Sequence, residues 1–220
     1  MEAVLDVQID HFVWGVPDLA AGIDDMAARL GAAPIRGGAH PGMGTQNALL
    51  SLGPDVYLEV IAPADELVPQ ASLGQRLQQL SAPGLITWVQ RTNRLDDIAA
   101  AANGMTALGP LPTQRQTPQG TLLSWELLFL RDHPFAGLMP FFIDWQETPH
   151  PASTSPAGGR FLDVRIASPQ ASELNQAFEQ VGLRSRAEAA QTASLAVTIA
   201  AAGGETRLAS TQETLSAWVV

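Results

Sequence analysis

Two stretches of this chain place predicted secondary structure in the same order, which is strand, helix, loop, strand, strand. They cover residues 7–63 and 85–146. The residue identity between the two copies is faint, whereas the order and the lengths of the elements match. A repeat of this kind predicts two modules of one architecture, each a small curved sheet rich in antiparallel strands with a helix on its back.

The first copy shows its elements clearly. Residues 7–16 are apolar and aromatic, as expected for a strand. Asp18 is a typical helix N-cap, residues 19–30 carry apolar side chains at helical spacing, and Gly31 is a typical stop. The rest of the copy is predicted as a Gly- and Pro-rich loop, with room for a short strand near its start, and then two strands, at residues 33–47, 48–53 and 55–63.

The second copy and the remainder of the chain follow the same logic. The second copy is predicted as strand, helix, strand and strand, at residues 85–92, 93–104, 117–130 and 137–146. Residues 64–80 are predicted to be helical with an interruption at Pro69. A third, shorter block is predicted as strand, helix and hairpin, at residues 160–168, 169–182 and 193–210. We therefore divide the chain into a first module, a helical connection, a second module, a linker and a C-terminal βαββ unit packed on the same domain, at residues 1–63, 64–84, 85–146, 147–159 and 160–220.

The composition excludes several classes of function. Lys and Arg number 12 against 22 Asp and Glu, a formal net charge of −10, so phosphates would be repelled and no nucleic-acid partner is expected. The chain has no cysteine, which excludes a disulfide scaffold, a thiolate zinc site and a cysteine nucleophile. The N-terminus lacks the basic region of a signal peptide, and no apolar run is long enough to span a bilayer. We therefore expect a cytoplasmic protein without a membrane partner.

Two stretches of the first copy, DHFVWGVPDLAAGIDDMAARLG and GGAHPGMGTQNALLSLGPDVYLEVIAP, carry a family resemblance. Over residues 9–63 the chain resembles the glyoxalase-like proteins of the vicinal oxygen chelate superfamily, and the resemblance extends more weakly over residues 140–151. It implies an α+β fold in which tandem βαβββ modules form a half-open curved sheet barrel with helices outside, here with a shorter C-terminal strand-helix-hairpin unit. Because the superfamily includes lyases, isomerases, dioxygenases and antibiotic-binding proteins, the resemblance implies a fold more than a reaction.

The resemblance also implies a place for a metal ion. In that superfamily each module gives one ligand from its first strand and one from its last, which here indicates His11 and Glu59. Aligning the second module on the first puts Thr87 opposite His11 and Asp144 opposite Glu59. Threonine is a poor ligand for a divalent ion and aspartate a good one. The resemblance thus implies one divalent ion (Zn, Mn, Fe or Ni) held by His11, Glu59 and Asp144. The alternative is a hydrogen-bonded His11–Glu59 pair lining a wet cleft.

Strand alternation supports the placement of the first pair. It puts His11 on one face of its strand and Asp10 and Phe12 on the other. In the later strand, Tyr57 and Glu59 share a face opposite a uniformly apolar one. Glu59 is therefore predicted to face the concavity, where a carboxylate must be hydrated, paired or liganded.

The remaining candidates would bind the substrate. The glycine-rich stretch GGAHPGMGTQN allows close approach of the backbone to a ligand. No Lys follows it with P-loop spacing, so no nucleotide cofactor is expected. An ordinary loop and, for the two tryptophans, the hydrophobic core are the alternative assignments. The predicted substrate-binding residues are His40, Thr45, Asn47, Tyr57, Trp88, Trp125 and His133.

The expected function is a glyoxalase-like enzyme, of lyase, isomerase or dioxygenase type, acting on a small oxygen-bearing organic molecule. A metal ion, if bound, would polarise a substrate oxygen, and Glu59 or Asp144 would move a proton. The alternative is a non-catalytic protein of the same fold that binds or sequesters a small molecule, which the incomplete ligand pair of the second module favours. A homodimer is a further expectation.

Overall fold

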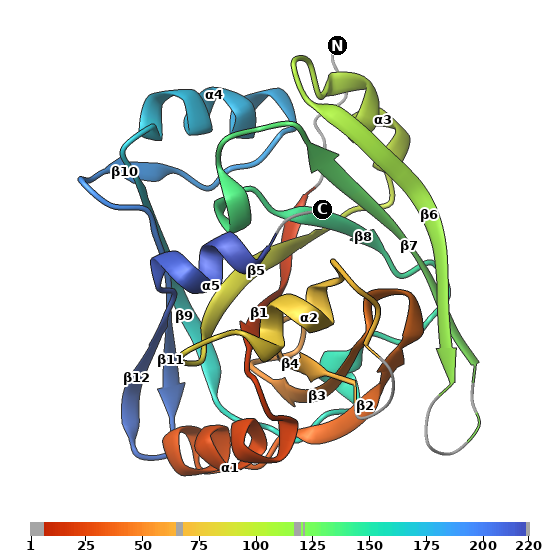
Figure 1. Ribbon diagram of the computed structural model, residues 1–220, viewed down its shortest axis with the longest axis vertical. Coiled ribbons are helices and arrows are strands. Elements are labelled where there is room, and N and C mark those ends of the chain that lie inside the picture. Colours follow the sequence, from red (N-terminus) through yellow and green to blue (C-terminus); the bar gives the residue numbers. More distant parts are fainter. Residues whose placement is uncertain (1–6, 65–67, 117–119, 121, 219–220) are drawn as a thin grey trace.

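The computed structural model describes residues 7–64, 68–116, 120 and 122–218. It contains two sheets, one of eight strands and one of four. The helices lie around these sheets (Figure 1). Among the described residues, no helix is long and apolar enough to cross a membrane.

The large sheet is built from two βαβββ units, as predicted. The two units meet at β1 and β5, which pair antiparallel, while β4 runs parallel to β1 and β8 parallel to β5. The sheet curls until its two edge strands, β2 and β6, come into contact. This curl gives the half-open barrel of the predicted fold class. Across the sheet the strands are β2 (Ile35–His40), β3 (Thr45–Ser51), β4 (Tyr57–Pro63), β1 (Gln8–Gly15), β5 (Gly84–Arg91), β8 (Phe141–Asp144), β7 (Leu122–Arg131) and β6 (Thr106–Gln116).

The helix of the first unit, α1 (Leu19–Leu30), begins and ends where its sequence signals indicate. The Asp18 side chain accepts a hydrogen bond from the backbone N–H of Ala21, and Gly31 adopts φ 78° at the C-terminal end. The shorter helices α2 (Leu73–Gln78) and α3 (Leu95–Ala101) follow. The predicted helix over residues 64–80 is thus limited to α2, which starts after the N-cap Ser72, and residues 65–67 lie outside the described part of the chain. Three single 3-10 turns complete this part, η1 (Pro41–Met43), η2 (Ala136–Leu138) and η3 (Pro151–Ser153).

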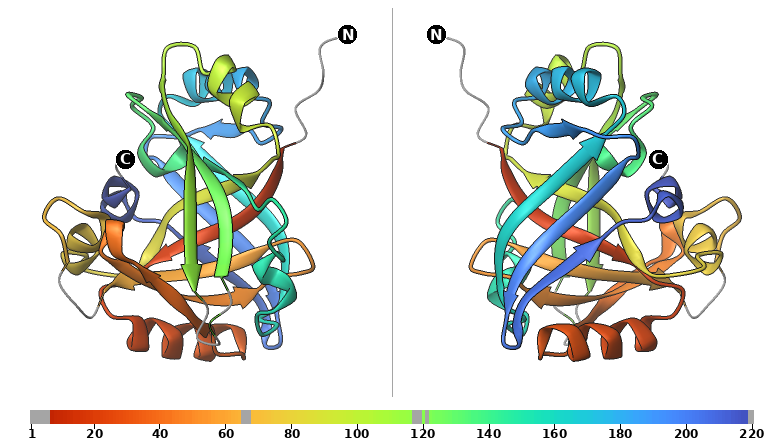
Figure 2. Two further views of the ribbon diagram at one scale, coloured as in Figure 1. Left: turned by 90° about the vertical axis from the view of Figure 1, so that its right-hand side faces the viewer. Right: turned by 90° about the vertical axis from the view of Figure 1, so that its left-hand side faces the viewer.

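The C-terminal unit forms the second sheet, in the order β10-β9-β11-β12. Figure 2 shows its long strands crossing over β1 and β5. A last helix, α5, returns from this unit to the concave side of the large sheet, where it lies beside α2 (Figure 1). The elements of the unit are β9 (Arg160–Ser168), α4 (Ala171–Gln180), β10 (Ala187–Ala189), β11 (Ser194–Ala201), β12 (Gly204–Ala209) and α5 (Gln212–Ala217).

The two faces of the large sheet bury two separate cores. On the convex face, Phe12 packs on Phe161 of β9, with ring centroids 5.3 Å apart, and Trp88 packs on Phe178 of α4 at 5.9 Å. The C-terminal unit therefore covers the back of the central strands. On the concave face, α2 adds Leu77 to a core rich in aromatic side chains, and this second core surrounds a cavity.

Strand β6 was not predicted from the sequence. It contains Pro110 and Pro112, which cannot donate ladder hydrogen bonds and normally argue against a strand. It forms nevertheless because it is an edge strand, paired only with β7, and its register shifts between Leu108 and Leu111. The strand predicted at residues 117–130 corresponds to β7; of its first residues, 117–119 and 121 lie outside the described part of the chain.

Candidate functional site

A cavity of about 400 Å³ opens on the concave face of the large sheet. Both modules and the C-terminal unit line it. Most of its wall is apolar, and the polar side chains that reach it come chiefly from the first module. This composition is typical of a site for a small organic molecule. The lining includes His11, His40, Asn47, Tyr57, Glu59, Trp125, Phe129, Phe141, Trp145 and Trp218.

A β-bulge in β1 places Asp10 and His11 side by side. Ile9 pairs with Gln90 and His11 pairs with the next residue, Val89, so Asp10 is the extra residue of the bulge. The bulge turns the Asp10 carboxylate away from the face that strand alternation predicts for it. Asp10 Oδ1 and His11 Nδ1 are 2.6 Å apart, and both side chains are buried.

Asp10 joins His11 to two segments of the second module and to the linker that follows it. Its Oδ2 accepts a hydrogen bond from the indole N–H of Trp145 at 3.0 Å and lies 3.0 Å from Nε2 of His150. The Arg91 guanidinium is 4.0 Å from the same oxygen. Asp10 is completely buried, so these groups replace the water that the carboxylate would otherwise bind.

Glu59 lies on the other side of His11. Its Oε2 is 3.4 Å from His11 Nε2, and its Oε1 accepts a hydrogen bond from the Asn47 side chain at 2.7 Å. The Asn47 Oδ1 accepts in turn from the backbone N–H of Gly38 at 3.0 Å. A Cβ at Gly37 would lie 2.3 Å from the same oxygen, so this part of the glycine-rich stretch must be glycine for Asn47 to reach Glu59.

The rings around His11 fix its plane. The Tyr57 ring stacks on the imidazole with centroids 4.3 Å apart, and the Phe141 ring meets it edge-on at 6.0 Å. His40 lies nearby, with Nδ1 3.1 Å from Thr45 Oγ1. The result is a row of buried polar groups, Asp10, His11, Glu59 and Asn47, that ends in the cavity.

The pKa shifts in this row follow from mutual pairing. Burial alone would raise the pKa of Glu59, but the hydrogen bond from His11 and its positive charge outweigh burial and lower that pKa to about 2. Burial is likewise outweighed at Asp10, where hydrogen bonds from His11 and His150 lower the pKa. The two carboxylates raise the pKa of His11 against the effect of its burial. At a pH below the raised pKa of His11, the row is therefore a carboxylate, an imidazolium and a second carboxylate in a line.

We expect the free energy of unfolding to be greatest between about pH 4.5 and 6.5, the ordinary pKa values of Glu and His. Glu59, with a folded pKa of about 2, stabilises the fold above pH 4.5 and loses this effect as the pH falls. His11, with a raised pKa, stabilises it below pH 6.5 and loses this effect as the pH rises through the folded value. Urea denaturation over a pH series measures both limbs. The His11→Gln variant should lack the alkaline loss, and an equal loss in both proteins would contradict the assignment.

The structure gathers some of the predicted substrate-binding residues and separates others. His40, Asn47, Tyr57 and Trp125 line the cavity. Thr45 does not line the cavity, but its hydroxyl lies within hydrogen-bond distance of the His40 ring. The remaining two are separated from it. Trp88 is fully buried in the convex core and donates its indole N–H to the Leu138 carbonyl oxygen at 2.8 Å, and His133 stacks on Phe135 in the loop after β7.

Asp144 is not brought together with His11 and Glu59. Across β1 and β5, His11 pairs with Val89 and Val13 pairs with Thr87. Exchanging the two modules turns one pair into the other, so Val13 and Val89 occupy equivalent places. Val13 pairs with Glu59 across β1 and β4, and Val89 pairs with Phe141 across β5 and β8. Phe141, three residues before Asp144, is therefore the counterpart of Glu59. Asp144 lies in a separate pocket of about 270 Å³ and accepts a hydrogen bond at 2.8 Å from a backbone N–H two residues later.

The residues present do not fit the two-module metal centre that the resemblance implies. His11 and Glu59 would be its ligands from one half, but Thr87 and Phe141 occupy the equivalent places in the other. A phenyl ring offers no donor atom and a hydroxyl is a poor one. The two ring nitrogens of His11 already face Asp10 and Glu59. Within the described ranges, no group of three or more His, Asp or Glu side chains is arranged to hold a metal ion.

Several residues of the site were not proposed from the sequence. Asp10 was assigned to the opposite face, because a bulge leaves no local signal. Sequence reasoning also did not propose His150, whose ring reaches Asp10, or the cavity-lining residues Phe129, Phe141, Trp145 and Trp218. One sequence signal was available near Trp218. Thr211 and Thr214 form a capping box, which indicates the start of a helix, α5, directly before Trp218.

Comparisons with known proteins agree with this architecture. Residues 9–182 match the family model of the glyoxalase-like domain. A hypothetical protein from Staphylococcus aureus shares the fold, with a TM-score of 0.67 and 16% sequence identity over 85% of this chain and 88% of that chain. Methylmalonyl-CoA epimerase from Mycobacterium tuberculosis matches with a TM-score of 0.49 and 20% identity over 70% of this chain and 95% of that chain. No curated protein sequence matches the chain.

Proposed function

Because this chain belongs to the glyoxalase-like domain family, within the vicinal oxygen chelate superfamily, we propose that it is an enzyme that moves a proton on a small oxygen-bearing organic molecule held in the cavity. The observation that carries the proposal is the row Asp10–His11–Glu59, which is buried behind the cavity and reaches it at Glu59 and His11. A buried acid–base pair at the polar end of an apolar cavity suits proton transfer next to a carbonyl group.

In the proposed step His11 binds the substrate oxygen and Glu59 is the base. The 3.4 Å separation of His11 Nε2 and Glu59 Oε2 is long for a hydrogen bond, so a substrate oxygen can take over the imidazolium N–H. Glu59 would then keep only its bond from Asn47, and burial would raise the pKa of its carboxyl. The carboxylate takes a proton from the carbon next to the carbonyl and returns it to another position or face. No electrons leave the substrate, and the product is an isomer.

Asp10 is a positioning residue in this proposal. It holds His11 by Nδ1, which directs Nε2 toward Glu59, and it stabilises the positive charge of the ring. No step is assigned to a divalent ion, because the donor set does not fit one. The homodimer and the cytoplasmic location expected from the sequence stay predictions.

A second candidate is a protein that binds the same kind of molecule without chemistry. The aromatic Phe141 at the place equivalent to Glu59 favours it, since of these two equivalent positions only the one in the first module carries an acid–base group. Both candidates place the ligand in the cavity, so binding alone does not separate them.

Hydrogen–deuterium exchange on the substrate distinguishes the two. Small ketones, hydroxyketones and enols are first screened for thermal stabilisation of the protein, which follows mass action. We expect the compounds that bind to lose the signal of the proton next to the carbonyl in deuterated water, followed by NMR, faster with the protein than without it. Binding of these compounds without any catalysed exchange would support the binding protein. Binding that persists in the His11→Gln variant would place the ligand outside the proposed site.

A further inference from the structure

We infer that the ligand of the cavity is uncharged and carries a flat aromatic ring system whose oxygen substituent faces His11 and Glu59. The inference rests on the proposed function only in taking this cavity as the site. Two independent features carry it, which are the charges at the cavity wall and the order of its rings.

Among the described side chains that line the cavity, none is a lysine or an arginine that would neutralise an anion. The chain as a whole contains no lysine. Glu59 is the acidic side chain at the wall, with Asp10 behind it. The two imidazoles already face partners, His11 between Asp10 and Glu59, and His40 beside Thr45. A carboxylate or phosphate would enter a low-dielectric space next to a carboxylate, which is unfavourable.

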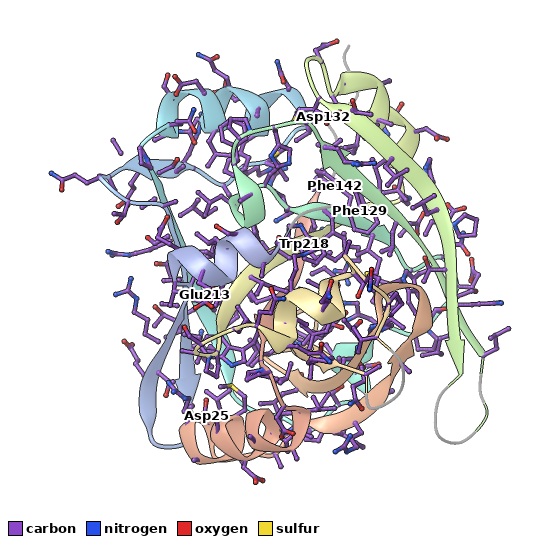
Figure 3. All side chains as sticks on the ribbon, in the orientation of Figure 1. Asp25, Phe129, Asp132, Phe142, Glu213 and Trp218 are labelled. Carbon is purple, nitrogen blue, oxygen red and sulfur yellow. The ribbon has the colours of Figure 1, made fainter. Side chains whose placement is uncertain are left out.

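The rings at the wall form one continuous series. The Trp218 and Phe141 rings are stacked with centroids 5.1 Å apart and an interplanar angle of 19°. Phe129 stacks on Phe141 at 5.1 Å, and Phe141 reaches the His11 ring at 6.0 Å. Figure 3 shows Phe129 and Trp218 next to each other, and their ring centroids are 6.3 Å apart. A flat ligand that packs along this series would bring one edge to the polar groups, and aromatic pairs favour such stacked or edge-on contacts.

Trp218 makes the C-terminal unit part of the specificity of the site. It directly follows α5, and α5 is anchored on both sides. The Arg76 side chain of α2 donates a hydrogen bond to the Ala217 carbonyl oxygen at 2.7 Å, and the Thr214 hydroxyl donates to the Leu85 carbonyl oxygen of β5 at 2.8 Å. The Trp218 indole is therefore held against the cavity wall, and through it α5 contributes to the choice of ligand.

Three probes that share the naphthalene ring and differ in charge test the inference. They are 2-naphthol, 2-naphthoate and 2-naphthylmethylammonium, titrated into the native protein at pH 7 by calorimetry, where the naphthol is neutral, like the tyrosine phenol with its pKa of about 10. We expect the naphthol to bind at least about tenfold more tightly than the naphthoate. Tighter binding of either charged probe, or no binding of the naphthol, would overturn the inference.

Two pairs of variants locate the effect. Trp218→Ala should weaken naphthol binding about tenfold, whereas Trp218→Phe, which keeps a ring, should restore most of it. Equal affinity of both variants would show that ring stacking at this position is unimportant.

Glu59→Gln should reduce the discrimination against naphthoate, because it removes the negative charge from the cavity wall. The matched change Glu126→Gln on β7, outside the cavity lining, should leave the discrimination unchanged. If none of the cavity variants changes the affinity of any probe, the proposed function fails as well. If anions bind better while Glu59 still matters, only the inference fails.

Discussion

The Asp10→Ala variant is expected to lose about 3–5 kcal/mol of the free energy of unfolding, the cost typical of breaking a buried ion pair from one side. Asp10 is fully buried and accepts from His11, His150 and Trp145. Its removal leaves three donors without their acceptor around a position that is fully buried. Urea denaturation at pH 6, where His11 is protonated and the carboxylates are ionised, measures the change.

Asp55→Ala is the matched control for this experiment. Asp55 also faces Arg91, with its Oδ1 3.7 Å from the guanidinium, but its side chain is 68% exposed. Exposed ion pairs contribute about 0–1 kcal/mol, so this variant should unfold almost like the native protein. Equal, small losses of the free energy of unfolding in both variants would show that the hydrogen bonds of Asp10 do not stabilise the fold.

The Glu59→Gln variant is expected to lose catalysed proton exchange by about 10²–10⁴-fold, the usual contribution of a general base, while it keeps its affinity for a neutral ligand. Glutamine preserves the size of the side chain and can still accept the hydrogen bond from Asn47, but it cannot take a proton. NMR exchange rates and calorimetric affinities on the same preparations separate the two quantities.

The change Glu126→Gln controls for the substitution itself, because Glu126 on β7 does not line the cavity. It should leave both exchange and affinity unchanged. Unaltered exchange in Glu59→Gln would remove Glu59 from the role of base, and exchange would then have to be sought at another group. A loss of ligand affinity equal to the loss of exchange would instead make Glu59 a binding residue.

Local signals in the sequence determined the modules and the first half of the site. The repeat of strand and helix patterns predicted two modules, the family resemblance implied that each is a βαβββ unit, and Asp18 with Gly31 predicted the ends of α1. The family resemblance selected His11 and Glu59. A strand repeats its faces every two residues, so alternation then predicted that Glu59 faces the concavity. Both side chains line the cavity and lie 3.4 Å apart.

Pairing between distant strands decided the rest, because register and bulges depend on partners that the local sequence does not name. The extra residue in β1 turned Asp10 toward His11, and the register of β8 against β5 put Phe141 where alignment had placed Asp144. β6 formed in spite of its prolines because an edge strand has an unpaired side. Trp218 reached the cavity only because the C-terminal unit packs on the convex core and returns α5 to the concave face, a contact between segments more than a hundred residues apart, as in the bond from Arg76 to Ala217.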